Sequence, residues 1–180
     1  MFENFLKMGD GENAIYGMFP YVSRISTYAH GQGREFIRYS SAVYRFKQSQ
    51  SHSAAVKRCI DELAAELAAE IAVVPSSTAC KVNSLQMIYG ISIKRDKTVK
   101  KAKYHHGDSN PPSDSCTIRV DFHGKRVLLV DDVVSTGTTL RNFRRFLMKE
   151  GGAASVAMFA VGMLVRRADY VPDGFMEGTI

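Results

Sequence analysis

The residues with the clearest chemical meaning lie together between Val127 and Thr139, in the order Val-Leu-Leu-Val-Asp-Asp-Val-Val-Ser-Thr-Gly-Thr-Thr. Asp131 and Asp132 follow an apolar run and precede a small loop that leads into a predicted helix. Free N–H groups at the start of a helix suit a phosphate, and Gly137 lets the backbone approach it closely. Carboxylates would repel that phosphate, but they accept hydrogen bonds from sugar hydroxyls, directly or through a metal. The stretch therefore predicts a site for a phosphorylated sugar.

The loop of this stretch is rich in hydroxyl donors, which are Ser135, Thr136, Thr138 and Thr139. Each half of the stretch has an ordinary explanation when taken alone: adjacent acids occur in turns and helix caps, and small polar residues occur in any loop. Both halves in register after a buried strand favour a ligand site. The stretch is not a P-loop, because no Gly-Lys-Ser/Thr is present and the acids precede the loop.

These residues must be positioned by helices and strands, which the spacing of apolar residues predicts in alternation along the chain. The expected helices cover residues 52–70, 79–90 and 138–150, and the expected strands cover residues 71–74, 91–93, 117–122, 126–130 and 155–164. This order predicts an α/β fold with a mostly parallel sheet flanked by helices. In such sheets, ligands bind beyond the carboxyl ends of the strands, where Asp131 and Asp132 would lie.

The N-terminal segment has a different composition, because residues 1–50 hold ten of the 18 aromatic residues and show no clean period. We expect a small irregular or β-rich cap, or hood, packed on the main domain; an aromatic surface that stacks on a planar ligand is the alternative. The predicted organisation is a cap over residues 1–50, a core over 51–165 with a flexible loop at 94–116, and a C-terminal segment, 166–180, that completes the hood.

Length and composition bound the class of protein. The chain has 180 residues, 45% of them hydrophobic and 23% charged, which is typical of one globular domain. No apolar run is long enough to span a membrane, and the first residues do not resemble a secretory signal. Three widely spaced cysteines argue against a disulfide framework or a zinc site, so we expect a reducing cytoplasm. The net charge of +6 calls for a polyanion such as nucleic acid, or for a small phosphorylated partner.

Val127–Thr139 resembles the 13-residue signature of the type I phosphoribosyltransferases, which use 5-phosphoribosyl-1-pyrophosphate (PRPP), and all thirteen positions fit. The resemblance implies that Asp131 and Asp132 are catalytic and hold the 2′- and 3′-hydroxyls of the ribose. It implies that residues 135–139 cradle the 5′-phosphate. The loop after the first core strand is implied to bind pyrophosphate, through Pro75, Ser76, Ser77, Thr78 and Lys81; a plain strand-to-helix connection is the alternative.

The same resemblance places a catalytic lid over the long loop after residue 93. Residues 94–104 hold six Lys or Arg and one Asp, so most of the net charge lies there. The cations that could close over pyrophosphate are Lys94, Arg95, Lys97, Lys100, Lys101 and Lys103, of which we assign Lys101 and Lys103 a catalytic role. A solvated charged loop is the alternative. Mg²⁺ is the implied cofactor, with no certain direct protein ligand and with Asp131 and Asp132 available through water.

The implied reaction is transfer of 5-phosphoribosyl from PRPP to a nitrogenous base or amine, with release of pyrophosphate. The acceptor cannot be read from the residues; Asp169 and Tyr170 are candidates for its contacts. The alternative function is a PRPP-sensing or nucleic-acid-binding regulator on the same fold, with nucleic acid the less favoured partner. A homodimer is plausible. Tyr44–Lys47 resembles the competence-factor-like subgroup, although the chain lacks that subgroup's N-terminal cysteine module.

Overall fold

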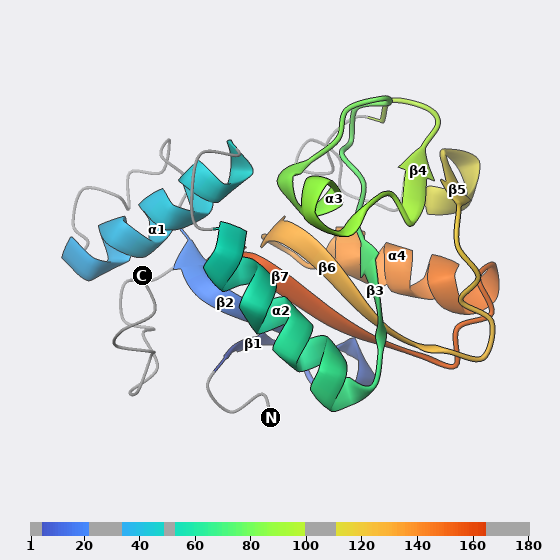
Figure 1. The fold of residues 1–180 in the computed structure, drawn as a ribbon, viewed down its shortest axis with the longest axis horizontal. Helices are drawn as coiled ribbons and strands as arrows, with labels where there is room; N and C mark the ends of the chain where they lie inside the picture. The colour runs from blue at the N-terminus through green and yellow to red at the C-terminus, as the bar shows by residue number, and fades with distance from the viewer. Residues whose placement is uncertain (1–4, 22–33, 49–52, 100–110, 165–180) are drawn as a thin grey trace.

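The structure is a computed structural model that describes residues 5–21, 34–48, 53–99 and 111–164 (Figure 1). Within these residues a five-stranded sheet has the order β1-β2-β7-β6-β3. Its strands are β1 (Leu6–Met8), β2 (Ile15–Tyr21), β3 (Glu70–Val73), β6 (Arg126–Val134) and β7 (Ser155–Leu164). All neighbouring pairs are parallel except β1 with β2, so the predicted α/β fold with a mostly parallel sheet is confirmed.

Helices cover both faces of this sheet, as Figure 1 shows with α2 and α4 on opposite sides. The four α-helices of the described residues are α1 (Arg34–Lys47), α2 (Ser53–Leu67), α3 (Ser84–Tyr89) and α4 (Thr138–Lys149). Alternate residues of β6 point to opposite faces: Val127 and Leu129 pack with α4, whereas Leu128 and Val130 pack with α1, α2 and α3. A strand buried on both faces explains the continuous apolar run of β6.

A second, two-stranded antiparallel sheet joins β4 (Ile93–Arg95) to β5 (Cys116–Ile118). The 3-10 turn η4 (Pro112–Asp114) precedes β5, and a second such turn, η1 (Gly11–Asn13), lies between β1 and β2. The segment expected as one long loop, 94–116, therefore begins and ends in ordered structure. Residues 100–110, between these two ends, lie outside the described part of the chain.

The described part of the first fifty residues is neither irregular nor purely β: β1 and β2 belong to the main sheet, and the helix α1 packs against it. β2 pairs with β7 along its length, from Ile15 opposite Met158 to Tyr21 opposite Leu164. The side chains of Ile15 and Phe19 are buried, so β2 contributes to the hydrophobic core and does not only cover the main domain. Among the described aromatics of this segment Phe19 and Phe46 are buried, and the lack of a clean period hid a strand that is buried on both faces.

Several predicted boundaries differ from the structure; for example, the helix expected over 52–70 ends at Leu67, and the strand expected over 91–93 lies at Ile93–Arg95. The helix expected over 79–90 begins only at Ser84, because Asn83 and Gln86 form a capping box that starts it there. β6 continues past the expected end at residue 130, since Val133 and Val134 still pair with β7. The strand expected over 117–122 is short and pairs with β4 instead of the main sheet. None of the helices in the described ranges is long and apolar enough to cross a membrane.

Candidate functional site

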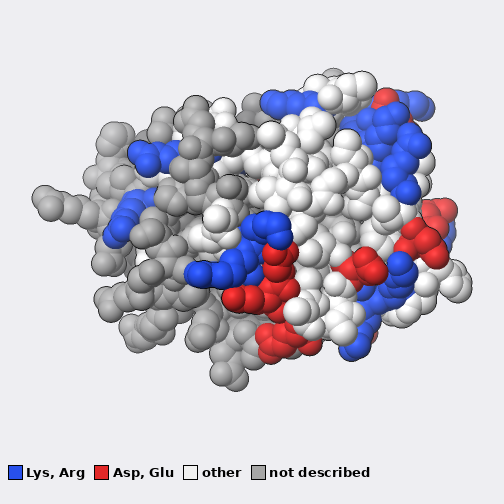
Figure 2. All heavy atoms as spheres, viewed as in Figure 1, with Lys and Arg blue, Asp and Glu red and all other residues white. Residues whose placement is uncertain are grey.

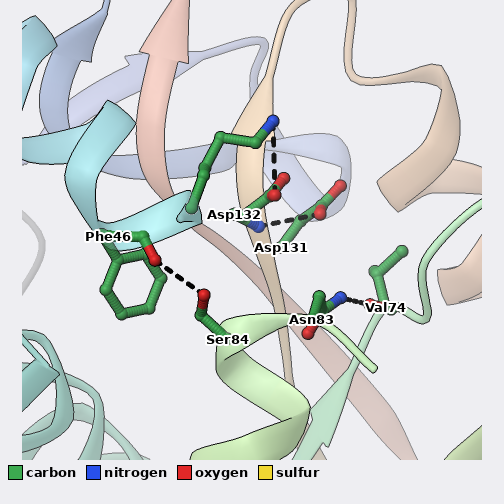
Figure 3. Close-up of polar contacts among 7 residues, drawn as sticks. Phe46, Val74, Asn83, Ser84, Asp131 and Asp132 are labelled. Carbon is green, nitrogen blue, oxygen red and sulfur yellow. Dashed lines mark hydrogen bonds and ion pairs between the residues drawn. The ribbon is translucent and has the colours of Figure 1, made fainter. Parts of the chain in front are cut away.

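The acid pair lies near the carboxyl end of β6, at the edge where the parallel strands end. Asp131 is in register with Ala160 of β7, so the strand carries the two acids as part of the sheet. The backbone N–H of Asp132 donates to Asp131 Oδ1 over 2.8 Å, and both side chains are partly buried (Figure 3). The sheet thus fixes the direction of both carboxylates before any ligand binds.

A lysine from a distant part of the chain contacts this pair. Lys47, the last residue of α1, places its Nζ 3.3 Å from Asp132 Oδ2. The end of α1 is held in place because the buried Ser84 hydroxyl donates to the Phe46 carbonyl over 2.6 Å (Figure 3). Sequence reasoning noted Lys47 only as part of a short motif and assigned it no role. Its separation of 85 positions from Asp132 leaves no local signal that could have linked them.

The electrostatics of the acid pair are unbalanced. Burial raises the pKa of Asp131 well above its ordinary value, and the neighbouring Asp132 carboxylate raises it further. The hydrogen bond from the Asp132 backbone and the positive charge of Lys47 lower that pKa, but less strongly. A partly buried acid beside a second acid is the arrangement expected of a binding site rather than of a structural turn.

The predicted 5′-phosphate loop follows directly and opens α4. Gly137 is the N-terminal cap residue of α4, with a left-handed φ of 78°, and no side chain caps the helix there. A Cβ at this position would lie 2.5 Å from Ile15 Cδ1, so glycine is required both by conformation and by space. Ser135 and Thr136 are exposed, and the Thr136 and Thr138 hydroxyls lie 3.0 Å apart. The Thr138 N–H donates to Thr136 Oγ1 over 3.4 Å, and the exposed hydroxyls at the start of α4 suit the binding of an anion.

The predicted pyrophosphate loop lies beside the acid pair because β3 and β6 are neighbours. The N–H of Val74 donates to the Val130 carbonyl over 2.9 Å, which continues the ladder to the start of the loop. The Asn83 side chain donates to the Val74 carbonyl over 2.9 Å and closes the loop at its other end (Figure 3). Ser76 and Ser77 are partly buried, whereas Thr78 and Lys81 are exposed. Pro75 is buried at the base.

The loop expected to act as a lid is joined to the pyrophosphate loop at its base. The N–H of Val99 donates to the Ser77 carbonyl over 2.9 Å, and the N–H of Ala79 donates to Thr98 Oγ1 over 2.9 Å. The expectation that Arg95 is a lid cation is wrong, because its side chain is buried. Exposed Lys94 pairs with Asp96 at 3.4 Å. The catalytic candidates Lys101 and Lys103, and the acceptor candidates Asp169 and Tyr170, lie outside the described residues.

The donor set at the acid pair suits a hard cation. Mg²⁺ takes oxygen ligands, retains several waters and is usually held by one or two carboxylates together with substrate phosphates. Asp131 and Asp132 supply the carboxylates, and the two loops predicted to hold phosphates lie next to them. Within the described residues, no group of three or more His, Cys, Asp or Glu side chains could hold a metal by itself. A cation here would therefore depend on the substrate for part of its coordination.

Fold and site together define an α/β protein with an acid pair beside two loops where the parallel strands end, an arrangement suited to a phosphorylated sugar. A family model described as the phosphoribosyl transferase domain matches residues 47–173, which is more than half of the chain. The chain belongs to this family. The matched region begins at Lys47 and includes both loops and the acid pair. Neither a curated protein nor a solved structure matches the chain significantly.

Proposed function

We propose that this phosphoribosyltransferase-family protein transfers the 5-phosphoribosyl group of PRPP to a nitrogen nucleophile and releases pyrophosphate. The observation that carries the proposal is the position of Asp131 and Asp132 on β6. The loop that follows β3 lies on one side of them, and the loop that opens α4 follows them along the chain. A ribose bound through its hydroxyls at the acid pair would extend its 5′-phosphate toward one loop and its pyrophosphate toward the other.

In the proposed reaction the bond from C1′ to the pyrophosphate oxygen breaks and a bond from C1′ to the acceptor nitrogen forms. The electron pair of the broken bond leaves with pyrophosphate, and the acceptor nitrogen loses its proton. Positive charge develops on the ribose ring, which the nearby carboxylates of Asp131 and Asp132 stabilise. Mg²⁺, when bound, neutralises charge on the pyrophosphate. Backbone N–H groups of the two loops hold the phosphates so that the reacting atoms are aligned.

Lys47 has two proposed effects in this site. Its ammonium keeps the Asp132 carboxylate in place, and its charge partly offsets the repulsion between the two acids. Its side chain is 37% exposed, so it can move aside or turn toward the substrate when the ribose hydroxyls bind. We therefore include Lys47 with the acid pair in the ribose subsite.

The test is a titration with PRPP and Mg²⁺, followed by a pyrophosphate-release assay with a panel of purines, pyrimidines, pyridines and primary amines. We expect one class of acceptor to release pyrophosphate, and we expect Asp132→Asn to lower turnover by more than about tenfold. Glu66→Gln, an exposed acid on α2, is the matched control and should keep the activity of the natural protein. Near-normal turnover in Asp132→Asn would remove the acid pair from the mechanism.

The second candidate function is a regulator that senses PRPP or binds nucleic acid. The net charge of +6 and the exposed Arg145 and Lys149 of α4 favour it. On the face drawn in Figure 2, however, Lys and Arg form separate groups with Asp and Glu among them, not a continuous basic surface. The regulator would bind PRPP without turnover and would bind RNA or DNA with a steep dependence on salt. We favour the transferase because this face lacks the continuous basic surface that nucleic-acid binding would need.

We place the protein in a reducing compartment such as the cytoplasm, because Cys59, Cys80 and Cys116 are all free. Cys59 and Cys116 are at least partly buried, and burial raises the pKa of the Cys59 thiol to about 11. A thiol with so high a pKa is mostly protonated at neutral pH and reacts slowly. Its presence is therefore compatible with an enzyme that uses no thiol chemistry.

A further inference from the structure

Arg95 is a buried cation with no carboxylate partner among the described residues. Its side chain is only 7% exposed. Its Nε donates to the Ser76 carbonyl over 3.1 Å, and its Nη1 donates to Ser115 Oγ over 2.8 Å. The guanidinium also lies 5.5 Å from the centre of the Phe143 ring. Burying a charge without an opposite charge is costly, so this arrangement calls for an explanation.

The position of Arg95 beneath the pyrophosphate loop supplies that explanation. The peptide bonds of the described residues are all trans, so the Ser76 carbonyl and the Ser77 N–H point in opposite directions. Because Arg95 holds the Ser76 carbonyl toward the interior, the Ser77 N–H points away from Arg95. Within the described residues this N–H has no acceptor, whereas the neighbouring N–H groups of Thr78 and Ala79 are already bonded. The loop thus keeps one oriented donor free.

The second anion loop repeats the arrangement with a different arginine. Nη1 of Arg141, one turn into α4, donates to the Thr136 carbonyl over 2.8 Å. By the same trans geometry, the N–H of Gly137 points away from Arg141. The loops that follow β3 and β6 differ in sequence, yet in each one an arginine donates a hydrogen bond to a backbone carbonyl. The repetition favours a shared role for the two arginines in orienting the loop peptides.

We propose that Arg95 is a positioning residue for the pyrophosphate subsite. It fixes the Ser76–Ser77 peptide so that the Ser77 N–H faces the bound diphosphate, and its buried charge adds a positive field behind the loop. This role rests on the proposed function, since it assumes that the loop receives the pyrophosphate of PRPP. Free pyrophosphate, the product of the reaction, would use the same Ser77 N–H as the pyrophosphate group of PRPP.

The test compares two ligands that use different loops. The natural protein, Arg95→Lys and Ser115→Ala are titrated by calorimetry with pyrophosphate plus Mg²⁺ and, separately, with ribose 5-phosphate. Lysine keeps the charge but cannot bond both Ser76 and Ser115 with the fixed fork of a guanidinium. We expect Arg95→Lys to weaken pyrophosphate binding by about tenfold and to change ribose 5-phosphate binding by less than about twofold. Arg119→Lys, at an exposed arginine just after β5, should change neither.

Ser115→Ala keeps the test decisive if Arg95→Lys fails to fold, because it removes only one of the two groups that hold the guanidinium. We expect it to weaken pyrophosphate binding selectively, by about threefold. Equal loss of both ligands, or normal binding of pyrophosphate in these variants, would overturn the role of Arg95. A natural protein that binds ribose 5-phosphate but not pyrophosphate would also overturn it. Failure of the natural protein to bind PRPP and either ligand would instead overturn the proposed function itself.

Discussion

At the scale of single residues, the acid pair on which the proposed function depends also makes the fold less stable at neutral pH. Burial and the neighbouring Asp132 raise the pKa of Asp131, so the folded protein holds a proton on Asp131 more tightly than the unfolded chain does. The free energy of unfolding therefore falls as the pH rises from the ordinary pKa of an aspartate through the raised value in the folded state. At neutral pH the free energy of unfolding is lowered, because the folded protein must either bury the Asp131 charge or keep Asp131 protonated.

Asp131→Asn should therefore make the protein more stable at neutral pH while weakening PRPP binding. Asparagine keeps the Oδ1 acceptor for the N–H of Asp132 but removes the charge. Melting temperatures measured between about pH 4 and about pH 8 should show the variant above the natural protein at the upper end, with the difference closing toward the lower end. A variant that is less stable at every pH would show that the Asp131 charge stabilises the fold.

Lys47→Met should move the pH dependence of activity. Lys47 lowers the pKa of Asp131, so its removal raises that pKa, and more base is then needed to ionise the acid pair. If ionised carboxylates bind the ribose hydroxyls, the acidic limb of the profile of kcat/KM for PRPP shifts to higher pH. Lys57→Met is the matched control, because Lys57 pairs with Asp61 on α2 and not with the acid pair. An unshifted limb in Lys47→Met would contradict the coupling between Lys47 and Asp131.

At the scale of elements, the start of α4 depends on a glycine for two separate reasons. Gly137 has a φ of 78°, and a Cβ there would also lie 2.5 Å from Ile15 Cδ1 and 2.8 Å from Arg141 Nη1. Gly124 has a similar φ of 70°, but no atom lies within 4 Å of an added Cβ. An alanine at position 124 would bear only the cost of its left-handed backbone, whereas an alanine at position 137 would bear that cost and the cost of steric overlap.

Gly124→Ala should lower the free energy of unfolding by about 1 kcal/mol, which is the cost of a left-handed alanine. Gly137→Ala should lower it by about 2–3 kcal/mol, because steric overlap is added to the same cost. It should also weaken the binding of ribose 5-phosphate by about tenfold, because the loop that precedes α4 would shift. Denaturant unfolding and calorimetry measure the two effects. Equal losses of stability in both variants would mean that Ile15 and Arg141 simply move aside.

The same elements show what the sequence could and could not predict. β6, β7 and α4 carry strong periodic or continuous apolar patterns, and their positions follow closely from Val127–Val130, residues 155–164, and the Leu140 and Phe143 stripe. α3 was placed too early because its start depends on one Asn83–Gln86 capping box, a local contact that outweighs the apolar period. The acids and small loops of the candidate site could be predicted because they are contiguous in sequence.

The contacts between distant segments could not be predicted in the same way. Lys47 with Asp132, and Arg95 with Ser76, each join residues whose meeting depends on how the helices and sheets pack. The sequence predicts an exposed Arg95 because this residue lies in a run of lysines, and composition alone gives no sign that one cation in the run points inward. Charge composition locates a basic segment but does not distinguish an exposed cation from a buried one.

At the scale of the whole molecule, the position of β2 determines whether the first fifty residues are separable. β2 is the parallel neighbour of β7, and β1 adds an antiparallel strand outside it. Without them, β7 would become an edge strand with a row of unpaired backbone groups. The core would also lose Ile15, Met18 and Phe19, which are all buried. Removing a cap that only covers the substrate would leave the core intact. Removing strands of the main sheet would not.

A chain shortened by residues 1–21 should therefore fail to melt cooperatively and should bind a hydrophobic dye at room temperature. The control is a chain that lacks only residues 1–4, which keeps β1 and β2 and should melt like the full chain. Circular dichroism and differential scanning calorimetry on the three chains measure the difference. If the shortened chain instead melts in one sharp transition near the temperature of the full chain, residues 1–21 belong to a separable hood. PRPP binding by that shortened chain would then place the whole ribose and phosphate site in the core that begins after them.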